Sequence, residues 1–211
     1  MPNFADKLPE LITVAIFLLI AFPVHEFSHA AVAYLQGDAT AKLFGRLTLN
    51  PIVHFDPYGG LMTIISVVFT GFIIGWAKPT PVNPANLHDR RNGEVLVALA
   101  GPASNFLMAL VGAFIYRVLD AAGVDLIGTM IGLVLYLFVL YNVLLAIFNF
   151  IPVPPLDGSA LLYRILTPRQ AWQVRPFLTQ YGIFVVLAVV LLASRPLSNA
   201  IYTVTNVLVG A

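Results

Sequence analysis

The sequence lacks cysteine and carries little charge. With no cysteine among its 211 residues, it can form neither disulfide bonds nor thiolate metal ligands, so His, Asp, Glu or water must hold any metal ion. Charged residues make up only 10% of the chain and the net charge is +1. This balance argues against a nucleic-acid partner, and no polybasic cluster predicts a lipid-headgroup patch.

Hydrophobic residues, by contrast, make up 59% of the chain, whereas an ordinary soluble domain has roughly 45–50% apolar and 25% charged residues. This composition excludes a soluble core and predicts an integral membrane protein embedded in a lipid bilayer. The length predicts a single membrane domain over residues 1–211, with a core at about 11–166 and C-terminal helices within 177–209. Four apolar stretches are long enough to be membrane-spanning helices, at residues 11–35, 94–119, 126–150 and 177–193.

The segments between these stretches predict smaller elements. Within Thr40 to Leu49, residues 43, 45, 47 and 49 (Leu, Gly, Leu, Leu) alternate with Phe44, Arg46 and Thr48. This period of two predicts a short strand or hairpin. Leu61 to Trp76 is apolar but only about 24 Å long as a helix, which favours a re-entrant segment. The predicted fold class is therefore an all-α polytopic membrane protein with about four to five transmembrane helices, a small β-hairpin or strand, and a re-entrant segment.

The chain is organised around AFPVHEFSHAAVA, residues 21–33, where His25, Glu26 and His29 are the only ionisable residues of the apolar run 11–35. Histidines four residues apart project from one helix face and can share a metal ion, while Glu26 can reach water at that ion. Ionisable side chains inside a membrane segment are costly and are candidates for function. This HExxH pattern therefore predicts a metallohydrolase site. Pro23, just before it, predicts a bend in the helix.

A catalytic zinc site generally takes three protein ligands, so two histidines leave the predicted site incomplete. Asp157 is the best third candidate, because it follows an apolar helix in the proline-rich segment IPVPPLDG. Irregular backbone at membrane depth is tolerated only where protein or a water-filled cavity satisfies it. His54, in the loop NPIVHFDPYGG, is a possible auxiliary residue, although such a histidine is more often a hydrogen-bonding turn residue.

The distribution of basic residues provides a test of topology. His25, His29 and Asp157 can meet only if 61–76 does not span. In that arrangement eight basic residues lie on the side of the membrane nearer the three predicted metal ligands, which we call the ligand side, and three lie on the opposite side. By the positive-inside rule this predicts a site nearer the cytoplasm. The eight are Lys42, Arg46, Lys78, Arg90, Arg91, Arg164, Arg169 and Arg175, and the three are Lys7, Arg117 and Arg195.

Together, HEFSH in an apolar helix, GPASN at residues 101–105 and the Asn149, Pro152, Asp157-Gly158 pattern resemble the site-2 protease family of intramembrane zinc metalloproteases. The resemblance covers about residues 21–166, and it is to the small prokaryotic branch without a PDZ domain, which implies the cell (inner) membrane. It implies one Zn²⁺ per chain held by His25, His29 and Asp157, and Glu26 as the catalytic carboxylate. It also implies that Asn149 positions substrate or the oxyanion, and it makes Asn105 a possible auxiliary residue.

The predicted function is an endopeptidase that hydrolyses peptide bonds within or near transmembrane segments of membrane proteins, with Glu26 as general base for zinc-activated water. The alternatives are a membrane-anchored metalloprotease acting on soluble or juxtamembrane segments and a non-catalytic zinc-binding membrane protein. A further hypothesis is that one edge of the strand predicted over Lys42 to Leu49 pairs with unwound substrate; the same element could equally cap the helix bundle. The sequence does not indicate the substrate, the trigger or the oligomeric state.

Overall fold

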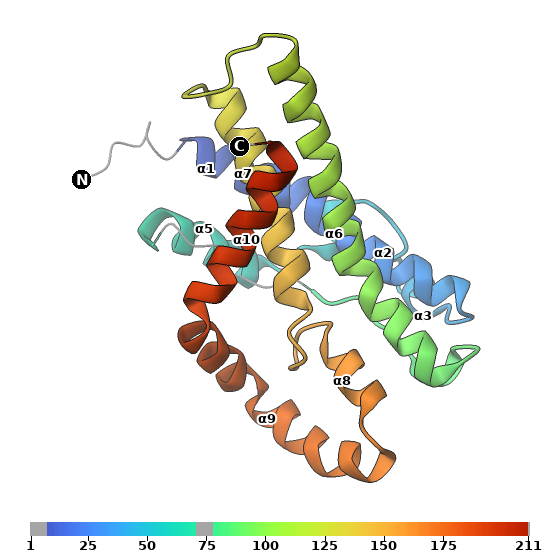
Figure 1. Cartoon of the computed structure of the whole chain (residues 1–211). Coiled ribbons are helices and arrows are strands. Elements are labelled where there is room, and N and C mark those ends of the chain that lie inside the picture. The colour runs from blue at the N-terminus through green and yellow to red at the C-terminus, as the bar shows by residue number, and fades with distance from the viewer. Residues whose placement is uncertain (1–7, 71–77, 211) are drawn as a thin grey trace.

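The computed structural model describes residues 8–70 and 78–210, and their regular structure is helical (Figure 1). Four of its helical stretches are long and apolar enough to cross a membrane: residues Leu11–Leu35, Arg90–Ala121, Met130–Asn149 and Pro168–Leu192. The elements in chain order are α1 (Leu8–Ile16), η2 (Phe17–Ala21), α2 (Phe22–Leu35), α3 (Thr40–Leu43), α4 (Pro51–His54), α5 (Pro57–Thr70), η3 (Pro84–Asn86), α6 (Arg90–Ala121), α7 (Met130–Asn149), α8 (Ser159–Ile165), α9 (Pro168–Leu192) and α10 (Ser194–Val209).

The first span changes its helical pitch just before the HExxH motif. Between α1 and α2, the stretch η2 is a π-helical turn in which the Phe22 amide donates to the Phe17 carbonyl. Pro23 sits in the first turn of α2, where its missing N–H removes a hydrogen bond, and a π-turn is one of the ways in which a helix absorbs such a defect. The irregularity expected at Pro23 is therefore a local π-turn inside a continuous helical run.

The long helix α6 is the centre of the bundle and packs against α2 on one side and α7 on the other. Small residues allow this close approach: a Cβ added at Gly112 would lie 2.9 Å from the Phe138 ring and 3.1 Å from Val139. Small interfacial residues are typical of helix packing in membranes. The largest buried cluster joins α6, α7 and α10, and comprises Ala109, Ala113, Val139, Leu140, Val143, Ile201 and Val209.

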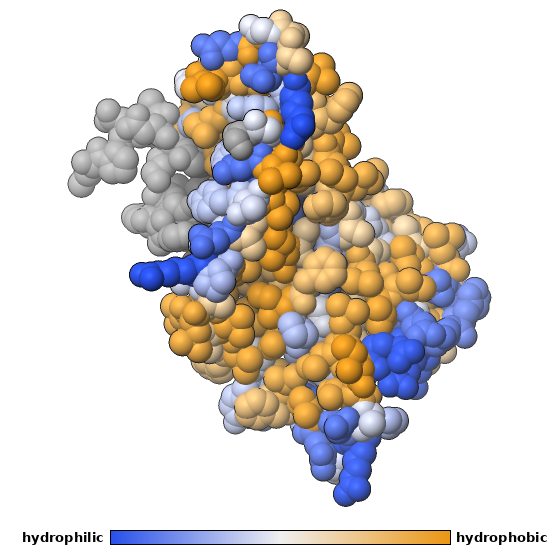
Figure 2. Space-filling model, viewed as in Figure 1, coloured by the Kyte–Doolittle hydropathy of each residue, from blue (hydrophilic) through white to orange (hydrophobic). Residues whose placement is uncertain are grey.

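The outer surface of the bundle is apolar. Apolar side chains cover most of the visible face in Figure 2, and hydrophilic ones gather near the starts of α6 and α9. On α9, Phe184 is 65% exposed and Leu192 88% exposed, which would be unfavourable in water but suits contact with lipid chains. Together with the four apolar helices, this surface makes the chain a multi-pass membrane protein, as its composition predicts.

The predicted strand within Thr40–Leu49 is wrong, since residues 8–70 and 78–210 contain no strand. Thr40–Leu43 instead forms the helical turn α3, and Gly45 reverses the chain with a φ of +67°. Arg46 is then buried and its guanidinium donates to the Lys78 carbonyl at 3.0 Å. Seven alternating residues carried too weak a signal against these contacts, and the hypothesis of substrate pairing with this strand falls with it.

The short apolar segment predicted over 61–76 begins within α5, Pro57–Thr70. Asp56 caps this helix, because its Oδ1 accepts hydrogen bonds from the amides of Tyr58 and Gly59. The 14 residues of α5 extend about 21 Å, which is less than the hydrocarbon thickness of a bilayer. Residues 71–77, the remainder of the segment, lie outside the described residues.

Candidate metal centre

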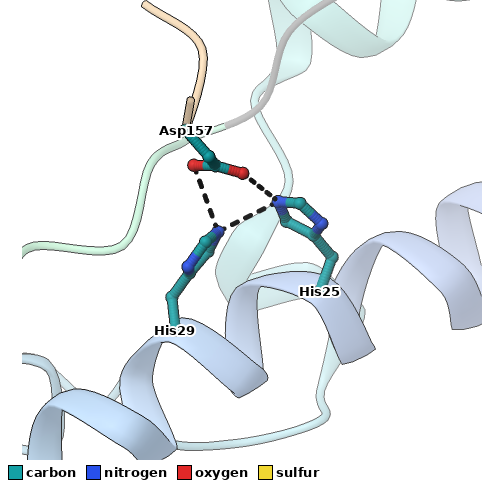
Figure 3. Close-up of side chains that lie close together, drawn as sticks. All are labelled: His25, His29 and Asp157. Carbon is teal, nitrogen blue, oxygen red and sulfur yellow. Dashed lines mark hydrogen bonds and ion pairs between the residues drawn. The ribbon is translucent and has the colours of Figure 1, made fainter. Parts of the chain in front are cut away.

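Three of the predicted site residues meet in space although they come from distant parts of the chain. His25 and His29 project from one face of α2 toward Asp157, which follows α7 (Figure 3). The two Nε2 atoms are 3.0 Å apart. The Nε2 of His25 lies 3.4 Å from Oδ2 of Asp157, and the Nε2 of His29 lies 3.4 Å from its Oδ1. We call these three residues the triad.

The chain after α7 folds back tightly and so brings Asp157 over α2. The Gly158 amide donates to the Asn149 carbonyl at 2.6 Å. A Cβ at Gly158 would lie 2.5 Å from the carbonyl oxygens of Phe150 and Ile151, so only glycine fits this turn. Val153, inside the same loop, packs against Leu178 and Val186 of α9. The loop is thus fixed by its own hydrogen bonds and by the fourth span.

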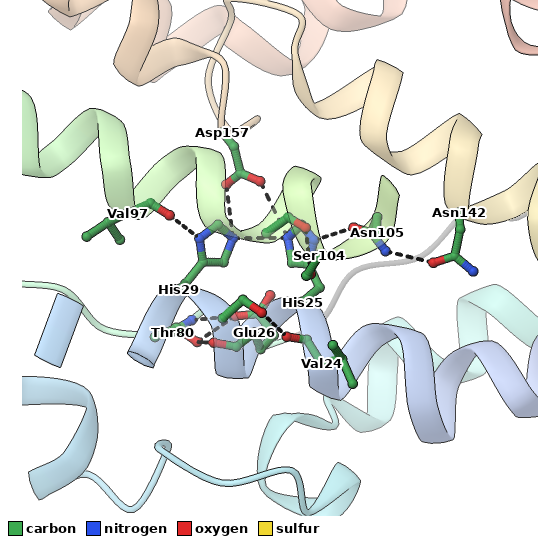
Figure 4. Close-up of polar contacts among 12 residues, drawn as sticks. Val24, His25, Glu26, His29, Thr80, Val97, Ser104, Asn105, Asn142 and Asp157 are labelled. Atoms are coloured by element: carbon green, nitrogen blue, oxygen red, sulfur yellow. Dashed lines mark hydrogen bonds and ion pairs between the residues drawn. The ribbon is translucent and has the colours of Figure 1, made fainter. Parts of the chain in front are cut away.

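Each histidine of the triad is oriented by a hydrogen bond at its other ring nitrogen (Figure 4). The Nδ1 of His29 pairs with the Val97 carbonyl at 2.7 Å. Because a carbonyl can only accept, this nitrogen carries the proton and Nε2 keeps its lone pair facing Asp157. Such partners fix the tautomer and orientation of metal-binding histidines. Since His29 is also buried, its ring has little freedom to turn away.

The second histidine is held by a chain of buried amides. The Nδ1 of His25 lies 2.5 Å from Oδ1 of Asn105, whose Nδ2 donates to Oδ1 of Asn142 at 3.1 Å. Asn142 in turn donates to the Phe138 carbonyl at 2.9 Å. Both asparagines are fully buried. The predicted auxiliary residue Asn105 therefore lies directly behind His25, and Asn142, which the sequence argument missed, lies behind Asn105.

Glycine at position 101 makes room for the imidazoles. A Cβ added to Gly101 would lie against Nε2 of His29 and 2.6 Å from Nε2 of His25. Real Cβ atoms essentially never approach other heavy atoms so closely. The second span, α6, can pass this close to the histidines only because it presents a bare backbone at Gly101.

The triad fits a zinc ion. Ligand atoms placed tetrahedrally at zinc–ligand distances of 2.0–2.1 Å are about 3.3 Å apart, close to the 3.0 and 3.4 Å separations in the triad. Two imidazoles and a carboxylate are a typical donor set for catalytic zinc. The Oδ2 of Asp157 is buried and accepts no hydrogen bond, and a buried oxygen without a donor is explained where a cation occupies the space.

The charge state of Asp157 also suits a cation. Burial by itself would raise the pKa of this carboxyl, but its interactions with the nearby His25 and His29 rings outweigh burial and lower the pKa to about 2. A carboxylate that stays ionised can bind a metal ion without first losing a proton.

Glu26 lies beside the triad and is not part of the group whose ligand atoms lie within 4.8 Å of one another. Its carboxylate is 8% exposed and accepts hydrogen bonds at Oε2 from the amide and the hydroxyl of Thr80. In Figure 4, Asp157 lies on one side of the imidazoles and the Glu26–Thr80 pair on the other. This arrangement suits a carboxylate that acts next to a metal rather than one that ligates it.

Two other predicted residues, His54 and Asn149, are not part of the triad. His54 is fully buried, with Nε2 paired to the Thr48 carbonyl at 2.8 Å and no partner at Nδ1, and it is not in the group that could hold a metal. Asn149 is the last residue of α7, half-buried, and its carbonyl accepts the turn bond from Gly158. Its side chain therefore lies at the junction between α7 and the Asp157 loop.

Comparison with known proteins agrees with the motifs. The chain matches the model of peptidase family M50 over residues 13–131 and 124–193. It is 40% identical over 198 residues to "Putative zinc metalloprotease YwhC" of Bacillus subtilis, covering 89% of this chain and 86% of that protein. "Putative zinc metalloprotease Rip2" of Mycolicibacterium smegmatis is 26% identical over 193 residues, covering 89% and 72%. No solved structure matches the chain.

Proposed function

The chain belongs to peptidase family M50, the site-2 protease family, and we propose that it is an intramembrane zinc endopeptidase cutting within or near transmembrane segments of membrane proteins. The observation that carries this proposal is the position of the triad and Glu26. His25, Glu26 and His29 are all buried inside the span Leu11–Leu35, and Asp157 comes to them from the end of another span. A protease acting only on soluble chains has no need to bury its metal ligands in a membrane helix.

The depth of the site supports a cut near one end of a substrate helix. His29 and His25 lie six and ten residues before Leu35, the end of the span, which places them about 9 and 15 Å from that end. Water entering from the ligand side therefore has to travel only about 9 to 15 Å to reach the two histidines. A substrate bond must reach the same depth, so the proposed scissile bond lies inside the bilayer but in the half nearer the ligand side.

The chemistry divides between the metal and the residues around it. When bound, a zinc ion supplies Lewis acidity, which lowers the pKa of water to about 7 and polarises a peptide carbonyl. His25, His29 and Asp157 would hold that ion, with Asn105 and the Val97 carbonyl fixing the two rings. Glu26 would take the proton from the attacking water and deliver it to the leaving amine as general base and then acid.

The role proposed for Asn149, to position substrate or the oxyanion, is inferred from the resemblance to the family. In the structure its backbone carbonyl receives the Gly158 amide, so its side chain stands next to the loop that carries Asp157. From there we propose that the Asn149 amide contacts the substrate carbonyl and helps to stabilise the developing oxyanion, as preorganised side-chain amides do in other hydrolases.

Substrate helices must unwind before they can be cut. A regular helix engages its carbonyls in hydrogen bonds to residues four positions later, so the scissile carbonyl becomes available only where the helix is locally open. Glycine and proline lower helix stability by about 1 and 3 kcal/mol relative to alanine. Substrates whose spans contain such residues at the proposed depth should therefore be preferred.

The topology supports a site on the cytoplasmic side. Along α6, Val97 meets His29 and Asn105 meets His25, so α6 runs antiparallel to α2 and starts on the side where α2 ends. Asn105 of α6 pairs with Asn142 of α7, and Gly112 lies beside Phe138 and Val139. α7 therefore runs antiparallel to α6, ends on that side as well and delivers Asp157. That side carries eight of the eleven basic residues, which by the positive-inside rule makes it cytoplasmic.

The test is to map the cut bond by mass spectrometry in a single-span membrane protein co-reconstituted with the purified protein, with Glu26→Gln as the inactive control. A cut inside the apolar span, absent in the control, supports the proposal. A cut confined to the polar flank would instead support a membrane-anchored protease acting on juxtamembrane segments. Stoichiometric zinc without cleavage of any single-span substrate would support a non-catalytic zinc protein.

A further inference from the structure

Glu26 contacts a segment that the mechanism above does not use, residues 78–86, which we call the strap. Its sequence, KPTPVNPAN, contains prolines at 79, 81 and 84. Proline pushes the preceding residue toward extended backbone, so Lys78, Thr80 and Asn83 are restricted in this way, and Asn83 has φ −105° and ψ 102°. Since prolines lack an N–H, Thr80 supplies the one main-chain donor among residues 79–81.

Thr80 directs both of its donors at Glu26 (Figure 4). Its amide lies 2.9 Å and its hydroxyl 2.7 Å from Oε2 of the carboxylate. Within the described part of the chain no hydrogen bond engages the other oxygen, Oε1. One carboxylate oxygen is therefore anchored and the other is left to accept a proton. Hydrogen bonds to a charged group are stronger than neutral ones, so this contact can hold the carboxylate in one orientation.

The strap is held just before Thr80 by Arg46, in the loop that follows α3, and by His54, the last residue of α4. The Lys78 carbonyl accepts a hydrogen bond from the guanidinium of Arg46 at 3.0 Å, and the Lys78 amide donates to the His54 carbonyl at 3.2 Å. Both Arg46 and His54 are buried. These contacts give a structural role to His54, which is otherwise unconnected to the triad.

The strap is tied down after Thr80 by Asp38. This carboxylate is fully buried and accepts hydrogen bonds from the Asn83 amide at 2.7 Å and the Asn86 side chain at 2.9 Å. It also accepts from the amide and hydroxyl of Thr40. Burial alone would raise the pKa of Asp38, but these hydrogen bonds lower it below its ordinary value. The carboxylate is thus an ionised anchor for the strap.

Asp38 is itself fixed to the helix that carries Glu26. Its amide donates to the Ala33 carbonyl at 2.9 Å, and the turn between them needs Gly37 at a φ of +102°. A Cβ at Gly37 would lie 3.0 Å from the Asn86 carbonyl and from the His88 ring. The strap therefore contacts α2 directly at Glu26, through Thr80, and is held to the end of the same helix through Asp38.

We infer that Thr80 is a positioning residue for Glu26 and that Asp38 positions Thr80 by anchoring the strap. The inference rests on the proposed function in one respect, that Glu26 is the proton acceptor. It gives a structural role to three buried polar residues outside the triad, Asp38, Arg46 and His54. All three hold the strap, and the strap holds the carboxylate beside the histidines.

The first test compares Thr80→Val with Thr80→Ser. Valine keeps the size and shape of threonine but removes the hydroxyl. We expect kcat to fall on the order of ten- to a hundredfold, the range for losing a hydrogen bond to a charged group, with KM within about twofold and zinc content unchanged. Serine restores the hydroxyl and should bring kcat back to within about threefold of the original protein. Asp38→Asn should lower kcat in the same direction.

The matched control is Thr167→Val, which removes a threonine hydroxyl that caps α9 and does not contact Glu26. It should leave kcat within about twofold. A Thr80→Val protein with kcat equal to that of the control overturns the inference. So does a loss in Thr80→Val that is accompanied by loss of zinc, or one that Thr80→Ser fails to restore, because either result indicates general damage to the site.

A second measurement detects the hydrogen bond between Thr80 and the Glu26 carboxylate without depending on substrate cleavage. The chain has only three glutamates, Glu10, Glu26 and Glu94, so infrared spectra of protein labelled with ¹³C-carboxyl glutamate, minus those of Glu26→Gln, isolate the Glu26 carboxylate stretch. Thr80→Val should shift this band and Thr167→Val should not. An unshifted band overturns the inference. A shifted band in a protein that cleaves no substrate would support the positioning contact and overturn the proposed function, so the two failures are distinguishable.

Discussion

Gly101→Ala provides a sharp test of the candidate metal centre, because helix propensity and site geometry predict opposite effects. Gly101 lies inside α6. Alanine in a helix interior is more favourable than glycine by roughly 0.5–1 kcal/mol. A methyl group at this position would nevertheless contact both imidazoles, within 2.5 Å of Cε1 and 2.6 Å of Nε2 of His25, and against Nε2 of His29. The added atom would occupy the space beside both ligand nitrogens.

The size of the effect follows from these distances. Ordinary contact to a Cβ begins at about 3.4 Å, so the rings or the helix must move by nearly 1 Å. A functional metal site tolerates departures of only about 0.2 Å in its ligand distances. We therefore expect the zinc affinity to fall by at least about a hundredfold, a loss of about 2.7 kcal/mol of binding free energy, while the metal-free protein keeps its fold.

The assay is zinc competition against a chelator of known affinity, together with thermal unfolding of the metal-free protein in detergent. Gly112→Ala is the matched control, since it adds the same atom to the same helix but meets Phe138 and Val139 of α7. The control should keep its zinc affinity and lose some stability. A Gly101→Ala protein that binds zinc as tightly as the unmodified chain would refute the placement of the ion between the two histidines.

Four further substitutions separate the roles of the site residues. Glu26→Gln should bind zinc stoichiometrically by elemental analysis but show no cleavage in a peptide-release assay, because only the proton acceptor is lost. Asp157→Ala should reduce zinc content as strongly as His25→Ala, since each removes one of three ligands; full zinc in the Asp157 variant would move the third ligand elsewhere. Asn105→Leu should weaken zinc binding on the order of ten- to a hundredfold in the chelator competition, as loss of a residue that orients a ligand does. Asn149→Ala should keep its zinc and lose turnover in the cleavage assay.

The membrane spans and the triad could be predicted because their signals are local or chemically narrow. Four apolar runs near 20 residues and the His25–His29 spacing each define a structure without tertiary information. Asp157 required a further step, the choice of an acid after an apolar helix in a segment that prolines keep from being helical. The topological argument that all three residues lie on one side agrees with the structure, in which their ligand atoms lie within 4.8 Å of one another.

The failure at residues 40–49 has a physical cause. A period of two over so few residues also fits a helical turn followed by an irregular loop. Here the outcome was set by contacts distant in sequence, chiefly the burial of Arg46 against the Lys78 carbonyl, and by the left-handed conformation of Gly45. An arginine in the middle of a supposed half-buried strand could have signalled that this side chain needed a specific partner.

Asn142 and Thr80 were missed for a related reason. Each makes its hydrogen bond over a long sequence separation, Asn142 with Asn105 and Thr80 with Glu26. A weak signal existed for both. Asn142 is a polar residue in the interior of an apolar span, where such residues need partners, and Thr80 stands between two prolines with the one amide available there. Neither pattern identifies its partner, which only the packing of the helices reveals.

The contacts around α2 show that the two chemical roles of HExxH are supported from different directions. The two histidines of the triad are oriented by the second span, α6, through Val97 and Asn105. The carboxylate of Glu26, about 100° around the helix, is oriented by the strap through Thr80. The two supports come from different parts of the chain, so in the proposed mechanism the rings can be held for the metal while the carboxylate is held separately for proton transfer. Inside an apolar bundle the protein must supply most of the hydrogen-bond partners that water supplies in a soluble hydrolase. The helix that carries the motif obtains them because it lies between α6 and the strap.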